Sequence, residues 1–164
     1  MDLEKYMEML RARGADPAIE IDPRTVETAA WTVFKCKYGC ARYGKTHCCP
    51  PEAPTWKQTQ EILDCYHRAV LFCVHHWETS AMVAEVVREA FLDGYYKAIG
   101  FGSGPCEICK KCNPEGCNFP DKVIPAMESC GIDVFATARN NGLEIHTLRD
   151  PEEQRNCFGL ILFE

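Results

Sequence analysis

Four cysteines between positions 106 and 117 constrain this chain more than any other feature. Cys106, Cys109, Cys112 and Cys117 follow the spacing C-x2-C-x2-C-x4-C. Three thiols separated twice by two residues can converge on different corners of one metal cluster while the loop wraps around it. The bacterial ferredoxin run C-x2-C-x2-C-x3-C-P binds iron–sulfur clusters through such cysteines. The run therefore predicts a [4Fe-4S] site on a loop that spans residues 104–120.

The run departs from the ferredoxin pattern at its end. Four residues rather than three separate Cys112 from Cys117, and Pro120 stands three positions after Cys117 instead of next to it. A wider turn accommodates one extra residue. Zinc is the alternative metal, but a four-cysteine zinc site usually draws on two C-x2-C pairs far apart in sequence. The spacing favours iron–sulfur and leaves zinc, a disulfide-rich loop or no metal as alternatives.

A second group of cysteines occupies a segment rich in glycine and proline, residues 36–51, which indicates a loop. The group contains Cys36, Cys40, Cys48 and Cys49. Adjacent cysteines rarely both bind one small ion, so we take Cys49 as the ligand and Cys48 as its substitute. The clustered soft ligands predict a second metal site whose fourth position is open or is filled by His47 or a distant cysteine. A structural zinc or a redox-active thiol pair are the alternatives.

The remaining cysteines are predicted to be core residues, because buried free cysteine behaves as a small hydrophobe. Cys73 lies within an apolar run, and Cys65 is expected near the inner face of a helix. Cys130 is a remote candidate for a spare ligand.

Composition limits the class of protein. The chain has 164 residues, 46% of them hydrophobic and 26% charged, which is enough for one domain without a disulfide scaffold. No signal peptide and no membrane-spanning apolar run is visible, so twelve cysteines are expected in a reducing cytosol. A net charge of −6, without a basic stripe interleaved with aromatics, argues against nucleic-acid binding.

Periodicity and turn residues predict a single α/β domain over residues 1–164, with a small mixed sheet, flanking helices and cysteine loops at 36–51 and 104–120. Asp2, Thr55 and Asp133 are predicted to cap helices, and Thr79 or Ser80 to cap another. Helices are expected at 3–13, 55–66, 79–94, 124–130 and 133–141, and extended segments at 19–21, 29–34, 69–74, 98–104, 143–146 and 158–163.

An ordered set of motifs resembles one known family, the domain of unknown function 2284, whose members are predicted metal-binding proteins found mainly in anaerobic prokaryotes. The motifs are Lys35–Cys40, Tyr43-Gly44, Cys49-Pro50-Pro51, Gly104–Cys112 and Met127–Phe135. The resemblance implies metal or iron–sulfur binding and no agreed activity. The first loop of that family usually ends in a single cysteine before two prolines, which favours Cys49 over Cys48.

Together these features predict a cytoplasmic iron–sulfur protein of an anaerobe, with one or two [4Fe-4S] clusters and a redox partner protein. We expect neither nucleic acid nor membrane as a partner. The sequence offers no convincing catalytic residue. Two alternatives stay open: a redox enzyme with an open-coordinated cluster at the Cys36 loop, and a zinc-stabilised interaction module.

Overall fold

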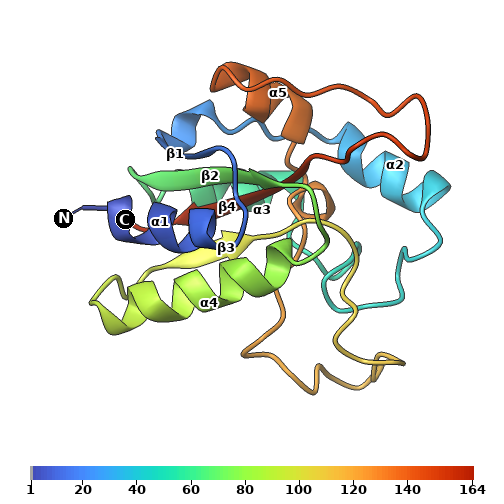
Figure 1. Ribbon diagram of the computed structural model, residues 1–164. Helices are drawn as coiled ribbons and strands as arrows, with labels where there is room; N and C mark the ends of the chain where they lie inside the picture. Colours follow the sequence, from blue (N-terminus) through green and yellow to red (C-terminus); the bar gives the residue numbers. More distant parts are fainter. Residues whose placement is uncertain (1) are drawn as a thin grey trace.

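The protein is built on an open four-stranded sheet, seen in a computed structural model that describes residues 2–164 (Figure 1). The strands are β1 (Ala18–Ile21), β2 (Ala69–Val74), β3 (Ile99–Phe101) and β4 (Cys157–Leu162), in the order β1-β2-β4-β3. All three strand pairs are antiparallel, where the sequence had predicted a mixed sheet. A single parallel bridge joins Gly102 to Ala126 outside the strands.

Helices cover both faces of the sheet, which confirms the α/β class (Figure 1). The helical elements are α1 (Glu4–Ala12), α2 (Trp31–Gly39), α3 (Trp56–Leu63), α4 (Thr79–Leu92) and α5 (Val134–Asn140), with the 3-10 turns η1 (Pro23–Thr25) and η2 (Glu128–Cys130). One core cluster joins α1 and α4 to one face, and a second joins α3 and α5 to the other. The result is a three-layered domain.

Strand β2 is buried on both faces, which explains why its sequence is apolar without interruption. Alternate side chains point to opposite faces of a strand, so Leu71 and Cys73 belong to one core while Val70 and Phe72 belong to the other. Strands β2 and β3 run in the same direction, since both are antiparallel to β4, which lies between them. Helix α4 connects them as the crossover of a split βαβ unit.

The local predictions meet mixed outcomes. Asp133 caps α5, and Thr55 forms a capping box with Gln58 at α3, as predicted. Thr79 is instead the first residue of α4, without a side-chain cap. The predicted helix over 124–130 is reduced to η2, and the predicted strand over 143–146 is irregular chain that pairs with no other strand among the described residues.

Helix α2 corrects the most consequential prediction, because residues 29–34 are not extended. The β-branched and aromatic residues there favour strands only where a sheet edge receives them, and this segment lies beyond the sheet. The Thr32 hydroxyl instead donates to the Ala29 carbonyl, 3.0 Å away, within a helical turn. Helix α2 and the cysteine loops lie together at one end of the sheet (Figure 1). Within residues 2–164, no helix has both the length and the apolar character needed to cross a membrane.

Candidate metal centres

The long loop that contains Cys106 is closed at its neck by two backbone hydrogen bonds. The Gly102 N–H donates to the Pro125 carbonyl at 2.8 Å, and the Met127 N–H donates to the Gly102 carbonyl at 2.9 Å. A Cβ at Gly102 would lie 2.2 Å from Ser80 Oγ, so only glycine allows the loop to leave β3 this close to α4. These two bonds hold both ends of the loop against the sheet, while the cysteine thiols of the loop line a cavity.

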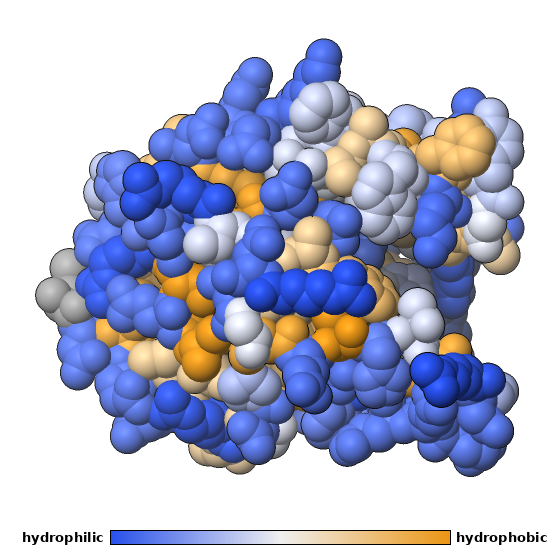
Figure 2. Space-filling view, turned by 90° about the horizontal axis from the view of Figure 1, so that it is seen from above, coloured by the Kyte–Doolittle hydropathy of each residue, from blue (hydrophilic) through white to orange (hydrophobic). Residues whose placement is uncertain are grey.

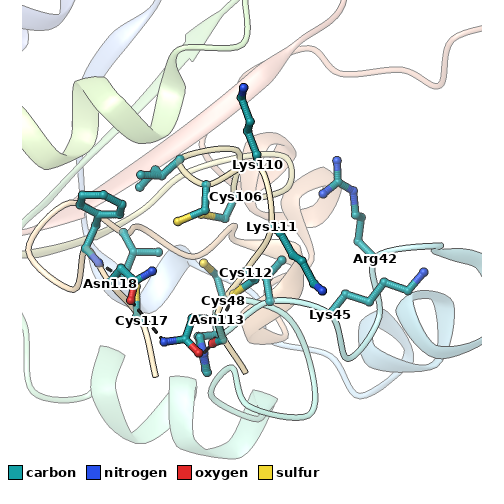
Figure 3. A pocket seen from close by; sticks show the side chains of 16 residues that line it. Arg42, Lys45, Cys48, Cys106, Lys110, Lys111, Cys112, Asn113, Cys117 and Asn118 are labelled. Atoms are coloured by element: carbon teal, nitrogen blue, oxygen red, sulfur yellow. Dashed lines mark hydrogen bonds between the residues drawn. The ribbon is translucent and has the colours of Figure 1, made fainter. Parts of the chain in front are cut away.

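Five thiols line one cavity of about 330 Å³ at this end of the molecule. They are Cys48, Cys106, Cys109, Cys112 and Cys117. Figure 3 shows the sulfur atoms of Cys48, Cys106 and Cys112 pointing toward a common space. The four predicted ligands of the 104–120 loop are therefore together, and one residue of the first loop has joined them.

Cys48 contacts Cys106 and is nearly inaccessible, with 6% of its surface exposed. Burial, followed by the charge of Cys106, raises the pKa of the Cys48 thiol to about 12. Burial and the neighbouring thiols of Cys112, Cys106 and Cys117 likewise raise the pKa of Cys109. Thiolates crowded in this way repel one another, and a bound cation reverses that balance by favouring the deprotonated ligands.

The other three thiols of the first loop, those of Cys36, Cys40 and Cys49, line a second cavity of about 230 Å³. Cys36 and Cys40 are one turn apart at the end of α2, and the Cys40 N–H donates to the Cys36 carbonyl at 3.1 Å. Burial, and then the charges of Cys40 and Cys49, raise the pKa of Cys36. The Thr46 hydroxyl donates a hydrogen bond to Cys49 Sγ at 3.0 Å.

Two polar contacts join the two cysteine loops: His47 contacts Asn113, and Arg42 contacts Glu107. His47 Nε2 lies 2.6 Å from the Asn113 carbonyl, and His47 Nδ1 lies 2.6 Å from a carboxylate oxygen of Glu52. Both partners are acceptors, so the imidazolium, which donates from both nitrogens, suits the site, and these bonds raise the pKa of His47. Arg42 forms a longer ion pair with Glu107 at 3.7 Å. His47 therefore connects the loops and is not placed as a ligand.

The solitary cysteines divide between core and surface. Cys73, Cys130 and Cys157 are buried, as predicted, whereas Cys65 is exposed beyond the end of α3 instead of on its inner face. Burial raises the pKa of Cys130 to about 12. Cys130 lies in η2, and the charge of Cys49 also raises the pKa of its thiol, so Cys130 lies near the three-thiol group.

The donor set fits a soft or borderline metal. Cysteines are the main candidate ligands of both cavities, with His47 also lining the larger one and Glu128 the smaller one, and all twelve cysteines are free thiols. Thiolate is the ligand of iron–sulfur clusters and of structural zinc. Within the described chain, no three potential ligands already stand where they could hold a metal ion, so binding requires the thiols to draw closer together.

The sequence did not reveal that Cys48 and Cys49 line different cavities, because the two residues were treated as substitutes for one ligand position. Neighbouring residues in a tight turn point in different directions, and here one thiol faces each cavity. That adjacency was the signal available in the sequence. The contact between His47 and Asn113 had no such signal, since it depends on how two distant loops fold together.

Comparison with known proteins agrees with this geometry. Neither a curated protein nor a solved structure matches the chain. A family model described as a predicted metal-binding protein, DUF2284, matches residues 19–163, which include both cysteine loops and all four strands except the first residue of β1. The chain therefore belongs to the DUF2284 family of predicted metal-binding proteins.

Proposed function

We propose that the protein is an iron–sulfur protein that transfers electrons in the cytosol of an anaerobe. The observation that supports this proposal is the gathering of eight of the twelve cysteines around two cavities at one end of the sheet. Reducing compartments keep such thiols available for metals. The family description supports metal binding, and the ferredoxin-like spacing of the Cys106 loop supports iron–sulfur over zinc.

The larger group of thiols holds a [4Fe-4S] cluster, which takes up and gives back one electron when bound. Cys106, Cys109, Cys112 and Cys117 would supply its four ligands from the loop, and Cys48 of the first segment would stand beside it as a fifth thiol lining the same cavity. The Phe119 N–H donates to Cys117 Sγ at 3.4 Å, and such bonds to sulfur tune the reduction potential. The three-thiol group, Cys36, Cys40 and Cys49, binds a second metal centre.

Metal analysis after anaerobic purification tests the proposal. We expect iron, acid-labile sulfide and a brown chromophore in the unmodified protein, and the contribution of the larger site to all three should be lost in Cys112→Ser. Cys65→Ser is the matched control, because Cys65 is an exposed thiol away from both cavities. Zinc alone, without labile sulfide or chromophore, would overturn the electron-transfer function.

A redox enzyme is the second candidate, and the three-thiol group favours it. Its cavity is otherwise lined by apolar and small residues, among them Pro50 and Ala126, and by the side chains of Arg42 and Glu128. A metal held by three thiols has one further coordination position, which a small molecule occupies in this candidate function unless the Glu128 carboxylate fills it. Cyanide added to the reduced protein should then change an EPR signal that depends on Cys49. An unchanged spectrum with cyanide, azide and carbon monoxide would count against this candidate.

A further inference from the structure

Helix α2 presents aromatic side chains to solvent instead of to the core. Trp31 is 48% exposed, Phe34 67% and Tyr38 69%, and the rings of Phe34 and Tyr38 are in contact in a tilted arrangement, with their centroids 4.7 Å apart. These positions follow the spacing i, i+3, i+7, so they form one stripe along the helix. Thr32 is the buried residue of α2. Three exposed aromatic rings in one stripe mark an interaction surface rather than isolated exposed residues.

The stripe lies on the side of α2 opposite the thiols. With 3.6 residues per turn, Thr32, Cys36 and Cys40 share the inner side of the helix, and Cys36 and Cys40 line the three-thiol cavity from it. An α-helix with its side chains is about 10–12 Å across. A redox centre in a protein docked on the stripe would therefore be separated from these thiols by little more than one helix.

Helix α2 and the first cysteine segment are positively charged, although the whole chain is not. Residues 31–51 contain Lys35, Lys37, Arg42 and Lys45 and no acidic residue, which is +4 within a chain of −6, so the remaining residues sum to −10. The cavity of the larger site is also lined by Lys110 and Lys111 and by no carboxylate. Figure 3 shows Arg42, Lys45 and Lys111 gathered on one side of that cavity.

Cations and rings alternate on α2 itself. Lys35 Nζ lies 5.7 Å from the centroid of the Trp31 ring, and Lys37 Nζ lies 5.5 Å from that of Tyr38. Figure 2 shows pale and orange side chains among the blue at the right-hand end of the molecule, where α2 lies. The surface combines apolar area with positive charge, which is the complement of an acidic protein surface with an apolar centre.

We propose that this surface, defined by Trp31, Phe34, Lys35, Lys37 and Tyr38, docks an acidic one-electron carrier protein. The inference rests on the proposed function and names the kind of partner that the metal centres exchange electrons with. One electron leaves the reduced carrier and one is gained by the metal centre at the thiols, with no proton or bond exchanged. The nine-residue helix suits the small, transient interfaces of redox complexes, which bury less than about 1,200 Å².

Binding of an acidic two-cluster bacterial ferredoxin tests the docking surface independently of the metal content. We expect Lys35→Glu combined with Lys37→Glu to weaken binding about tenfold at low salt, and a tenfold rise in salt to remove most of the difference. Phe34→Ala should weaken binding by a factor that does not depend on salt, because an aromatic anchor is lost. Calorimetry without oxygen measures both effects.

Helix α4 provides matched controls on another face of the protein. Phe91 is 59% exposed and Arg88 is exposed on that helix, so Phe91→Ala removes an exposed ring elsewhere and Arg88→Glu reverses one charge where the α2 variant reverses two. Both controls should bind ferredoxin like the unmodified protein. Equal losses from α2 and α4 variants would overturn the proposal, as would unchanged binding in the α2 variants.

Two further measurements separate this proposal from the proposed function and from a nucleic-acid surface. Reduction by pre-reduced methyl viologen should proceed equally in all variants, whereas reduction by pre-reduced ferredoxin should slow about tenfold in the α2 variants. If methyl viologen reduces nothing, the electron-transfer function fails while the calorimetry still decides the docking surface. Displacement of ferredoxin from α2 by single-stranded DNA at equal concentration would overturn the protein partner in favour of nucleic acid.

Discussion

The thiol of Cys48 lies against that of Cys106, while its sequence neighbour Cys49 faces Cys36 and Cys40. A two-residue segment thus contributes to two cavities. The pair separates the first loop into one thiol for the larger group and three for the smaller, and it places the two candidate metal centres side by side.

This partition predicts that the two cysteines have different effects when replaced. In a Cys36→Ser, Cys40→Ser background, where only the larger site can be occupied, Cys48→Ser should lower its metal affinity about tenfold or more, since a contact to the bound group is lost. Cys49→Ser in the same background should leave the affinity unchanged. Iron content and the EPR spectrum measure both. An equal effect of the two replacements would contradict the partition.

His47 is predicted to support the larger site without binding the metal. Its replacement by alanine removes the contacts to Asn113 and Glu52, so the loops lose their shared orientation and the affinity for Co²⁺ should fall about tenfold. His146→Ala is the control, because His146 is exposed in the irregular segment after α5. Titration of the metal-free protein, followed through the thiolate-to-cobalt absorption, compares the two variants. A loss of all cobalt binding in His47→Ala would make His47 a ligand instead.

Metal removal should loosen the cysteine loops and leave the sheet folded. Both core clusters are formed mainly by strands and helices outside the loops, with contributions such as Leu71 and Val83. Chelation should therefore preserve the far-UV circular dichroism, while a lysine-specific protease should cut at Lys110 and Lys111 on the order of tenfold faster. Cooperative unfolding on chelation would instead support the zinc-stabilised interaction module.

Gly131 is predicted to be required for stability, because it packs against the start of α3 and contacts the residues just before α2. Its φ is +85°, and an added Cβ would lie 2.5 Å from Trp56 Cα, while its carbonyl accepts from the Ala29 N–H at 2.8 Å just before α2. Gly131→Ala should lower the free energy of unfolding by about 3 kcal/mol, since left-handed strain and overpacking add.

Gly142→Ala is the control, because it introduces the left-handed backbone strain without the overpacking expected at Gly131. Gly142 has a φ of +72° and open space around it, so the same change should cost about 1 kcal/mol. Urea denaturation measures both variants. Equal losses would show that the contact with Trp56 is relaxed at little cost.

Structural features that depend on residues close together in sequence were predictable. The cap of Asp133, the capping box at Thr55 and the strand over 69–74 depend on residues close in sequence, and the structure has all three. The helical state of residues 31–39 was not predictable in this way. Trp31 and Val33 favour a strand locally, and only the lack of a neighbouring sheet edge in the fold leaves them helical.

The sequence by itself determined that eight cysteines fall in two short segments of an α/β domain, because spacing, turn residues and hydrophobic periodicity are local properties. It predicted a loop from residue 36 onward, whereas Cys36 lies within helix α2. Only the tertiary structure decided which thiols share a cavity. That choice depends on the hydrogen bonds at the neck of the Cys106 loop and on the contact of His47 with Asn113. These contacts join residues far apart in the chain, so no local pattern specifies them.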